Sequence, residues 1–189
     1  MTDRSGTVTG QPIVYRTAHA TDSAAIASLH AASWRYTYKG IFSQHYLEQQ
    51  VDKDRLTYWE RCLKASNPER EVILACRGVQ LLGFICLIAE AHPVMGTIID
   101  NLHVDIDTQR QGIARQLLHC GASWVLARQE SPAIYLEVLA ENHAAIAYYK
   151  RLGAAHRETN RWQTPGNGPI VEDLRYAWAD AQLLLSPKG

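Results

Sequence analysis

Three apolar runs follow one another in the middle of the chain, and they restrict the fold more than any other feature of the sequence. They are EVILACR at 71–77, LLGFICLIAEA at 81–91 and GTIIDNLHVDI at 96–106. Each run has the length and residue types of a strand, and Arg77-Gly78-Val79 between the first two is a hairpin signal. His92-Pro93 separates the second run from the third. The pattern predicts three strands that meander antiparallel.

Further strand and helix patterns flank this meander. The other strands are expected at IVYR (13–16), at AIYLEVLA (133–140) and in a final hairpin around the turn PGNGP (165–169). Helices are expected after residue 21, over 53–64, over 112–129 and from Asn142 to just before Gly153, with 33–47 a loop or short helix. The order predicts a single α/β (α+β) domain, with a mixed, mostly antiparallel sheet of about seven strands and about four helices.

Composition restricts the binding partners, metal sites and cellular location that we expect. The chain has 19 Lys plus Arg and 19 Asp plus Glu, so no excess of positive charge favours nucleic acid or an anionic membrane. The four cysteines lack a CxxC spacing, the histidines lack metal-ligand spacing, and the longest apolar run is too short to span a bilayer. We therefore expect a cytoplasmic protein without a metal site. Residues 1–12 and 181–189 are expected to be tails around a domain at 13–180.

The stretch QRQGIARQLL at 109–118 places a small-residue turn between a strand and a helix. The first turn of a helix has unpaired N–H groups and a partial positive charge, and glycine lets a ligand approach the backbone closely. Arg110 and Arg115 can add side-chain charge. The turn therefore predicts a phosphate site at Gly112. Taken alone, it is equally compatible with a glycine that serves only the conformation of the chain.

The wider context of this turn resembles the GCN5-related N-acetyltransferase (GNAT) family. NLHV precedes VDIDTQRQGIARQLL, and ENHAAIAYYKRLGA follows after one strand. Gln109, Gly112 and Ala114 match in order the family's (Q/R)xxGx(G/A) loop, which holds the pyrophosphate of acetyl-CoA. The resemblance is strong from about 96 to 154 and weaker over 13–95. It implies a GNAT-like fold and an acetyl-CoA-dependent N-acetyltransferase, an acyltransferase that acts on a primary amine.

The resemblance also implies which residues contact the cosubstrate acetyl-CoA. The strand before the loop pairs through its main chain with the pantetheine arm, the loop binds the pyrophosphate, and the later helix brings an Asn and a Tyr to the cofactor. These positions are Leu102, His103, Val104, Gln109, Arg110, Gln111, Gly112, Ile113, Ala114, Arg115, Asn142 and Tyr149. Seven residues separate Asn142 from Tyr149, which returns the helix to nearly the same azimuth.

Acetyl transfer requires a neutral amine and a proton for the departing thiolate. Tyr149 is the candidate phenol for that proton, although core packing is an alternative role, and an ordinary helix cap is an alternative for Asn142. Tyr148 is the better core candidate. For the base we hypothesise Asp100 acting through water, because Asp100 shares strand parity with Leu102. A bulge would reverse that parity and favour His103, and Glu137 is a third choice.

The acceptor is expected to be a small-molecule or peptide amine, contacted by Trp34 and Tyr38 beside Glu137. An aromatic cluster can equally be core. No nucleic acid or membrane partner is expected, and a homodimer is possible. Two other functions stay open: a catalytically inactive acyl-CoA sensor or interaction module, and a nucleotide-binding α/β protein. The latter is disfavoured because neither GxGxxG nor a GK(S/T) lysine occurs.

Overall fold

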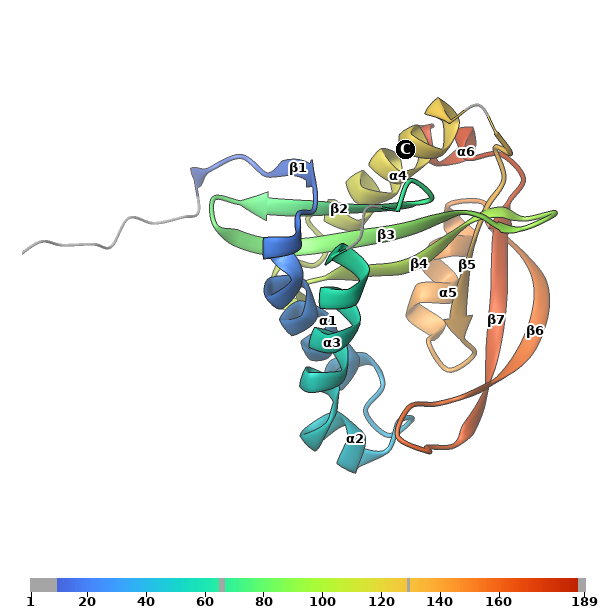
Figure 1. The fold of residues 1–189 in the computed structure, drawn as a ribbon. Coiled ribbons are helices and arrows are strands. Elements are labelled where there is room, and N and C mark those ends of the chain that lie inside the picture. The colour runs from blue at the N-terminus through green and yellow to red at the C-terminus, as the bar shows by residue number, and fades with distance from the viewer. Residues whose placement is uncertain (1–9, 65–66, 129, 187–189) are drawn as a thin grey trace, which may run out of the picture.

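A computed structural model of the chain describes residues 10–64, 67–128 and 130–186. It contains one seven-stranded sheet in the order β1-β2-β3-β4-β5-β7-β6 (Figure 1). The strands are β1 (Val14–Thr17), β2 (Arg70–Arg77), β3 (Gln80–His92), β4 (Gly96–Val104), β5 (Ile134–Leu139), β6 (Ala155–Gln163) and β7 (Ile170–Trp178). Neighbouring strands are antiparallel, except that β4 and β5 run parallel. The predicted mixed sheet of seven strands is confirmed.

Six α-helices occur in the described residues. They are α1 (Ser23–Thr37), α2 (Gln44–Gln49), α3 (Val51–Lys64), α4 (Ile113–Ala127), α5 (His143–Arg151) and α6 (Gln182–Leu185), with short 3-10 turns at Ala20–Asp22 and Ile106–Thr108. The four expected helices correspond to α1, α3, α4 and α5, α2 begins within the stretch 33–47 that was expected to be a loop or short helix, and α6 is additional. None of the helices in the described part of the chain combines the length and apolar character that a membrane crossing requires.

Helices cover both faces of the sheet, and their apolar spacing explains why. On one face α1 and α3 pack against β2 and β3 around Trp59 and Phe84. On the other face α4, α5 and α6 enclose the larger core (Figure 1). The buried stripe of α4 is formed by Ile113, Leu117, Leu118, Ala122 and Val125. Ala114, in the first turn of α4, is only half-buried.

The C-terminal segment was expected to be a tail from residue 181, and this expectation was wrong for the residues described. Ala181 is fully buried, and its N–H donates to the Pro132 carbonyl over 2.8 Å. Leu184 of α6 is buried in the same core as α4. Ala181 and Leu184 are three residues apart, so a single helical turn places both on the side that faces the core. Residues 187–189, and residues 1–9 of the expected N-terminal tail, lie outside the described residues.

The sheet opens between β4 and β5. These strands pair only from Thr97 with Ile134 to Ile99 with Leu136. Beyond these three residue pairs β4 continues alongside β3, while β5 continues alongside β7. The sheet is therefore divided into two halves that separate in the direction of the carboxyl ends of β4 and β5. Side chains and main-chain groups from both halves face the resulting space.

Candidate functional site

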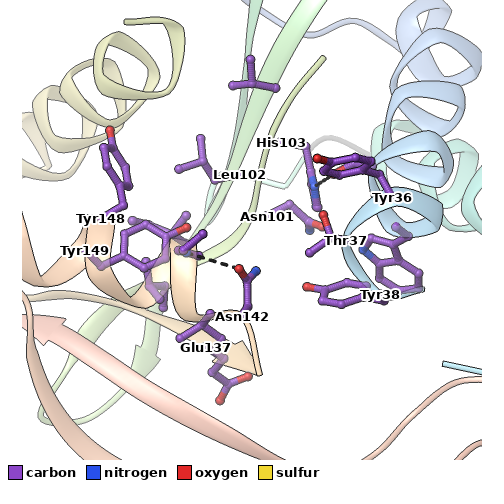
Figure 2. Close-up of a pocket in the computed structure, with 18 of the residues that line it drawn as sticks. Tyr36, Thr37, Tyr38, Asn101, Leu102, His103, Glu137, Asn142, Tyr148 and Tyr149 are labelled. Atoms are coloured by element: carbon purple, nitrogen blue, oxygen red, sulfur yellow. Dashed lines mark hydrogen bonds between the residues drawn. The ribbon is translucent and has the colours of Figure 1, made fainter. Parts of the chain in front are cut away.

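Three connected cavities occupy the opening between β4 and β5. The central one has a volume of about 770 Å³ and lies between the end of α1, the end of β4, β5 and α5 (Figure 2). A second, of about 500 Å³, shares Leu102, Gln109 and Tyr149 with it and extends to the turn before α4. A third, of about 330 Å³, shares Trp34 and Tyr38 with it and lies on the opposite side.

The turn before α4 has the geometry of an anion site. Gly112 is the N-cap residue of α4 and has a φ of 81°, in the left-handed region that favours glycine. Gly112 has no side chain to accept hydrogen bonds from the first-turn N–H groups of this 15-residue helix. A Cβ at this position would meet no heavy atom within 4 Å, so the space above the turn is open. Main-chain donors and the positive helix end therefore face the second cavity.

Most of the predicted loop residues line this second cavity. Gln109, Arg110, Gly112, Ile113, Ala114 and Arg115 do so. Gln111 does not, since its side-chain oxygen lies 3.4 Å from a guanidinium nitrogen of Arg77 on the other side of the turn. Arg115 donates to the Ser186 carbonyl over 3.2 Å. The structure thus brings together every predicted loop residue except Gln111.

The open edge of β4 presents main-chain groups to the central cavity. The Asp105 N–H donates to the Leu82 carbonyl over 2.8 Å and so points toward β3. Alternate residues of a strand direct their main-chain groups to the same side. His103 therefore faces β3 as well, whereas the N–H and C=O groups of Leu102 and Val104 face the opening. No β5 residue pairs with them in the described structure. They are available to an extended ligand lying along the strand.

A bulge changes which residues of β4 share a face. Asn101 lies opposite Cys86 and Ile99 opposite Leu87, so Asp100 is the extra residue. Asp100 is exposed, and its carboxylate accepts a 2.8 Å hydrogen bond from Tyr58 of α3. It also accepts a 2.6 Å bond from the Asn101 side chain. The predicted parity of Asp100 with Leu102 was wrong, because the bulge places Asp100 on the face of Asn101 and His103. Asp100 nevertheless lines the central cavity.

His103 also lines the central cavity. Its Nδ1 lies 2.8 Å from the Ser33 hydroxyl, and its ring lies 4.4 Å from the ring of the fully buried His30. Burial, together with the nearby Arg55 guanidinium, lowers the pKa of His103 to about 3. The imidazole is therefore neutral at physiological pH. It can exchange hydrogen bonds with a ligand but binds a proton only weakly.

Helix α5 supplies an amide and two phenols. The Asn142 side-chain oxygen accepts a hydrogen bond from the Ala145 N–H over 3.2 Å, so Asn142 caps α5, while its amide group lines the central cavity. Tyr149 faces the interior of that cavity, and the Tyr148 hydroxyl points toward α4 (Figure 2). Burial, with smaller contributions from Tyr38 and Tyr148, raises the pKa of Tyr149. This phenol therefore keeps its proton at neutral pH.

Tyr148, expected to pack in the core, also contributes to the cavities. Its ring packs against the core, yet it lines both the central and the second cavity. Its hydroxyl is buried without a hydrogen-bond partner among the described residues. Arg115 and Arg151 are close enough to oppose the burial that raises the Tyr148 pKa. An unsatisfied donor beside the glycine turn is suited to a ligand with acceptor oxygens.

The aromatic residues expected near the acceptor both pack in a hydrophobic cluster and line the cavities. Trp34 and Tyr38 pack in a cluster with Phe42 and line the central and third cavities. Glu137 lines both as well, and its carboxylate pairs with Arg175 over 2.7 Å. Several residues that line the third cavity were not predicted from the sequence, among them Arg55, Tyr58, Trp162 and Asp173. They come from α3, β6 and β7, and no local motif links them to the site.

Comparison with known proteins identifies the fold. Residues 27–154 match the model of the acetyltransferase (GNAT) family. The chain belongs to the GNAT family. The glycine turn, the β4 edge and α5 of this GNAT chain all lie within the matched residues or at their boundary. No curated protein sequence matches the chain significantly.

Solved structures of acetyltransferases share its fold across most of their length. PaiA N-acetyltransferase from Thermoplasma acidophilum, solved in complex with coenzyme A, is 22% identical, covers 85% of this chain and 98% of its own, and superposes with a TM-score of 0.62. A GNAT acetyltransferase from Streptococcus pneumoniae is 16% identical, with coverages of 88% and 98% and a TM-score of 0.61. An acetyltransferase from Thermus thermophilus is 17% identical, with coverages of 88% and 96% and a TM-score of 0.59.

Proposed function

We propose that this chain is an N-acetyltransferase that transfers the acetyl group of acetyl-CoA to a primary amine of a small molecule or peptide, by direct attack in a ternary complex. The observation that carries the proposal is the continuity of the central and second cavities. They connect an anion-binding turn at Gly112, an open strand edge at Leu102 and Val104, and the Tyr149 phenol. A ligand with a diphosphate at one end and a thioester at the other matches this order.

The residues present fit acetyl-CoA, which supplies an acetyl group activated as a thioester. The first-turn amides of α4 and Gln109 would hold the pyrophosphate. The main chain of Leu102 and Val104 would hold the pantetheine arm, and one N–H of this edge would stabilise charge on the carbonyl oxygen. The Asn142 amide would hold the same arm from the side of α5. Each role uses a group that faces the cavities.

Tyr149 is proposed to donate its phenolic proton to the departing thiolate. The acceptor nitrogen forms a bond to the carbonyl carbon as the carbon–sulfur bond breaks. The nitrogen then loses a proton that returns through water to the Tyr149 oxygen or to solvent. A thiol with a pKa of about 8.5 and a phenol with a pKa of about 10 are close enough in acidity for this transfer. Burial raises the pKa of Tyr149, which keeps the phenol protonated but makes it a weaker acid, so the proposed transfer depends on direct contact between the phenol and the thiolate.

Asp100 is proposed to accept, through water, the proton that the acceptor ammonium must lose before attack. Tyr58 and Asn101 hold its carboxylate at the cavity wall by hydrogen bonds of 2.8 and 2.6 Å. The other two candidates are less suited. His103 has a pKa of about 3, so it is a weak base, and the Glu137 carboxylate is occupied by Arg175. An Asp100→Asn enzyme whose pH–rate profile is unchanged would remove Asp100 from this role.

The test of the proposed function is thiol release from acetyl-CoA over a panel of primary amines, combined with calorimetric binding of acetyl-CoA. Transfer predicts release that depends on the amine, with an acetylated amine as the product in the mass spectrum. An inactive acyl-CoA sensor is the second candidate, and it would bind acetyl-CoA yet release no thiol above the buffer rate. Failure to bind acetyl-CoA at all would reject both.

A further inference from the structure

The third cavity has aromatic walls and lies beside the site of transfer. Trp34, Tyr38 and Phe42 form one wall, with Tyr38 stacked on Phe42 at 4.5 Å between ring centroids. Trp162, which is 37% exposed, also lines the cavity and contacts Phe42 with 5.7 Å between ring centroids. We call this space the aromatic cavity. Faces of aromatic rings attract cations, and a ring that is partly exposed costs little to desolvate.

Asp173 lines the aromatic cavity with a carboxylate that has no ion-pair partner among the residues that the structure describes. Its side chain comes from β7, opposite Leu139 of β5, and the residue is only 9% exposed. Within the described residues it forms neither a side-chain hydrogen bond nor an ion pair, since the nearby Arg175 is engaged with Glu137 and Glu158. Burying a carboxylate without a counterion costs free energy, and a bound cation would lower that cost.

Of the other charged groups that line the aromatic cavity, Arg55 and Glu137 form ion pairs, whereas Asp100 is hydrogen-bonded by neutral groups. Arg55 lies 3.1 Å from Asp54 and stacks over the Trp34 and Tyr58 rings at 4.3 and 4.9 Å. Asp100 accepts two hydrogen bonds, and Glu137 pairs with Arg175. The unbalanced charge of the aromatic cavity is therefore negative, and it is located at Asp173 and Asp100, of which only Asp100 accepts side-chain hydrogen bonds among the described residues. A cationic organic group fits both the charge and the walls.

We propose that the aromatic cavity binds a second ammonium group of the acceptor, so that the acceptor of this enzyme is a molecule with two amines. The inference rests on the proposed function, because it takes the first amine to react in the central cavity. The two cavities share Trp34, Tyr38 and Asp100, so one linear molecule can extend from Tyr149 to Asp173. Asp173 and Trp162 recognise its distal amine.

The experiment compares acceptors that differ only in the distal group. Diamines from 1,3-diaminopropane to 1,6-diaminohexane are matched with n-alkylamines and ω-amino carboxylic acids of equal length, and kcat/KM is measured from thiol release. The ratio of the kcat/KM of the best diamine to that of its matched alkylamine is expected to be about 10 to 100. This is the size of a charge-assisted contact. In Asp173→Asn this ratio is expected to fall to about threefold or less. Glu172→Gln, an exposed carboxylate on the same strand, is the matched control and retains the ratio.

Trp162→Leu provides a second variant on the exposed face of β6, in case Asp173→Asn does not fold by circular dichroism. It is expected to lower the ratio about three- to tenfold through loss of the cation–π contact. Three results overturn the inference while leaving the proposed function intact: alkylamines turned over as well as diamines, ω-amino carboxylates preferred through Arg55, or an equal loss on all acceptors in Asp173→Asn. Absence of thiol release with every amine would instead reject the proposed function.

Discussion

Tyr149 and its neighbour Tyr148 show how one step along a helix gives two side chains different surroundings. Both are half-buried residues of α5, and their rings are 5.6 Å apart. Tyr149 faces the interior of the central cavity, whereas the Tyr148 hydroxyl points toward α4 (Figure 2). Tyr148 also lines the second cavity together with Gly112. Tyr149 is suited to protonate a thiolate, and Tyr148 to contact a phosphate or pantetheine oxygen.

Tyr149→Phe should therefore lower kcat by about 100-fold or more, the usual range for loss of a positioned general acid. The Kd of acetyl-CoA should change less than about threefold, because the ring and its packing against Trp178 remain. Tyr148→Phe is the matched control and should leave kcat within about threefold while weakening acetyl-CoA binding. Thiol release and calorimetry measure the two effects. A Tyr149→Phe enzyme with undiminished kcat would assign the proton to another donor.

Asp173 also makes stability depend on pH. Burial, reinforced by the Glu137 carboxylate and opposed by Arg175, raises the pKa of Asp173 from 3.8 to about 6. The folded protein thus holds this proton more tightly than the unfolded chain, so stability falls as pH rises from about 4 to about 6. Asp173→Asn removes the penalty, and its gain over the wild type should be about 2 kcal/mol larger at pH 7.5 than at pH 4.5.

Urea unfolding of both proteins at the two pH values measures this difference, with Glu172→Gln as the control for a change of charge on β7. A gain that is the same at both pH values would mean that the Asp173 carboxyl is not desolvated in the folded protein. A diamine present in excess should reduce the gain at pH 7.5, since it would bind the wild-type carboxylate. The same residue then links stability to ligand recognition.

At the scale of elements, most of the fold and half of the site could be predicted from local patterns. Apolar periodicity located the strands and the four main helices, and the spacing from Asn142 to Tyr149 placed both on the cavity side of α5. The bulge at Asp100 could not be placed, because one extra residue in β4 is defined only by its register with β3. Asp173 was missed because its burial depends on the β6–β7 hairpin packing against Phe42 and against Tyr46 of α2, which no local pattern encodes.

The glycine turn allows a test in which backbone strain is separated from ligand binding. Gly112 and Gly40 have φ values of 81° and 82°, and a Cβ at either position meets no atom within 4 Å. Replacing either residue with Ala should cost about 1 kcal/mol of stability by the same left-handed strain. Only Gly112→Ala should also weaken acetyl-CoA, by about tenfold or more, because its methyl group would stand over the first-turn N–H groups.

Urea unfolding compares the two stabilities and calorimetry compares the two Kd values. If both variants bind acetyl-CoA like the wild type, the turn before α4 does not hold the diphosphate. If Gly40→Ala weakens acetyl-CoA as much as Gly112→Ala does, the loss reflects general destabilisation. Comparing the two variants distinguishes these outcomes, because the two glycines have nearly the same local geometry and lie in different parts of the structure.

At the scale of the whole molecule, the sheet is weakest where the ligand is proposed to bind. Only three residue pairs join β4 to β5, and the two halves are otherwise connected through the core beneath α4 and α5. A pantetheine arm along β4 would satisfy main-chain groups that the sheet leaves open, and contacts with α5 would connect the halves. Coenzyme binding should therefore stabilise the whole molecule.

Coenzyme A at about 100 times its Kd should add about 2.7 kcal/mol to the free energy of unfolding, since it binds the folded chain alone. For a protein of 189 residues this corresponds to a rise in Tm of about 5 to 10 °C. ATP and NAD at the same concentration should raise Tm far less. They share the diphosphate that the α4 turn would hold but lack an arm to lie along Leu102 and Val104. An equal shift with ATP would mean that the turn alone supplies the affinity, and that the open edge of β4 takes no part in binding.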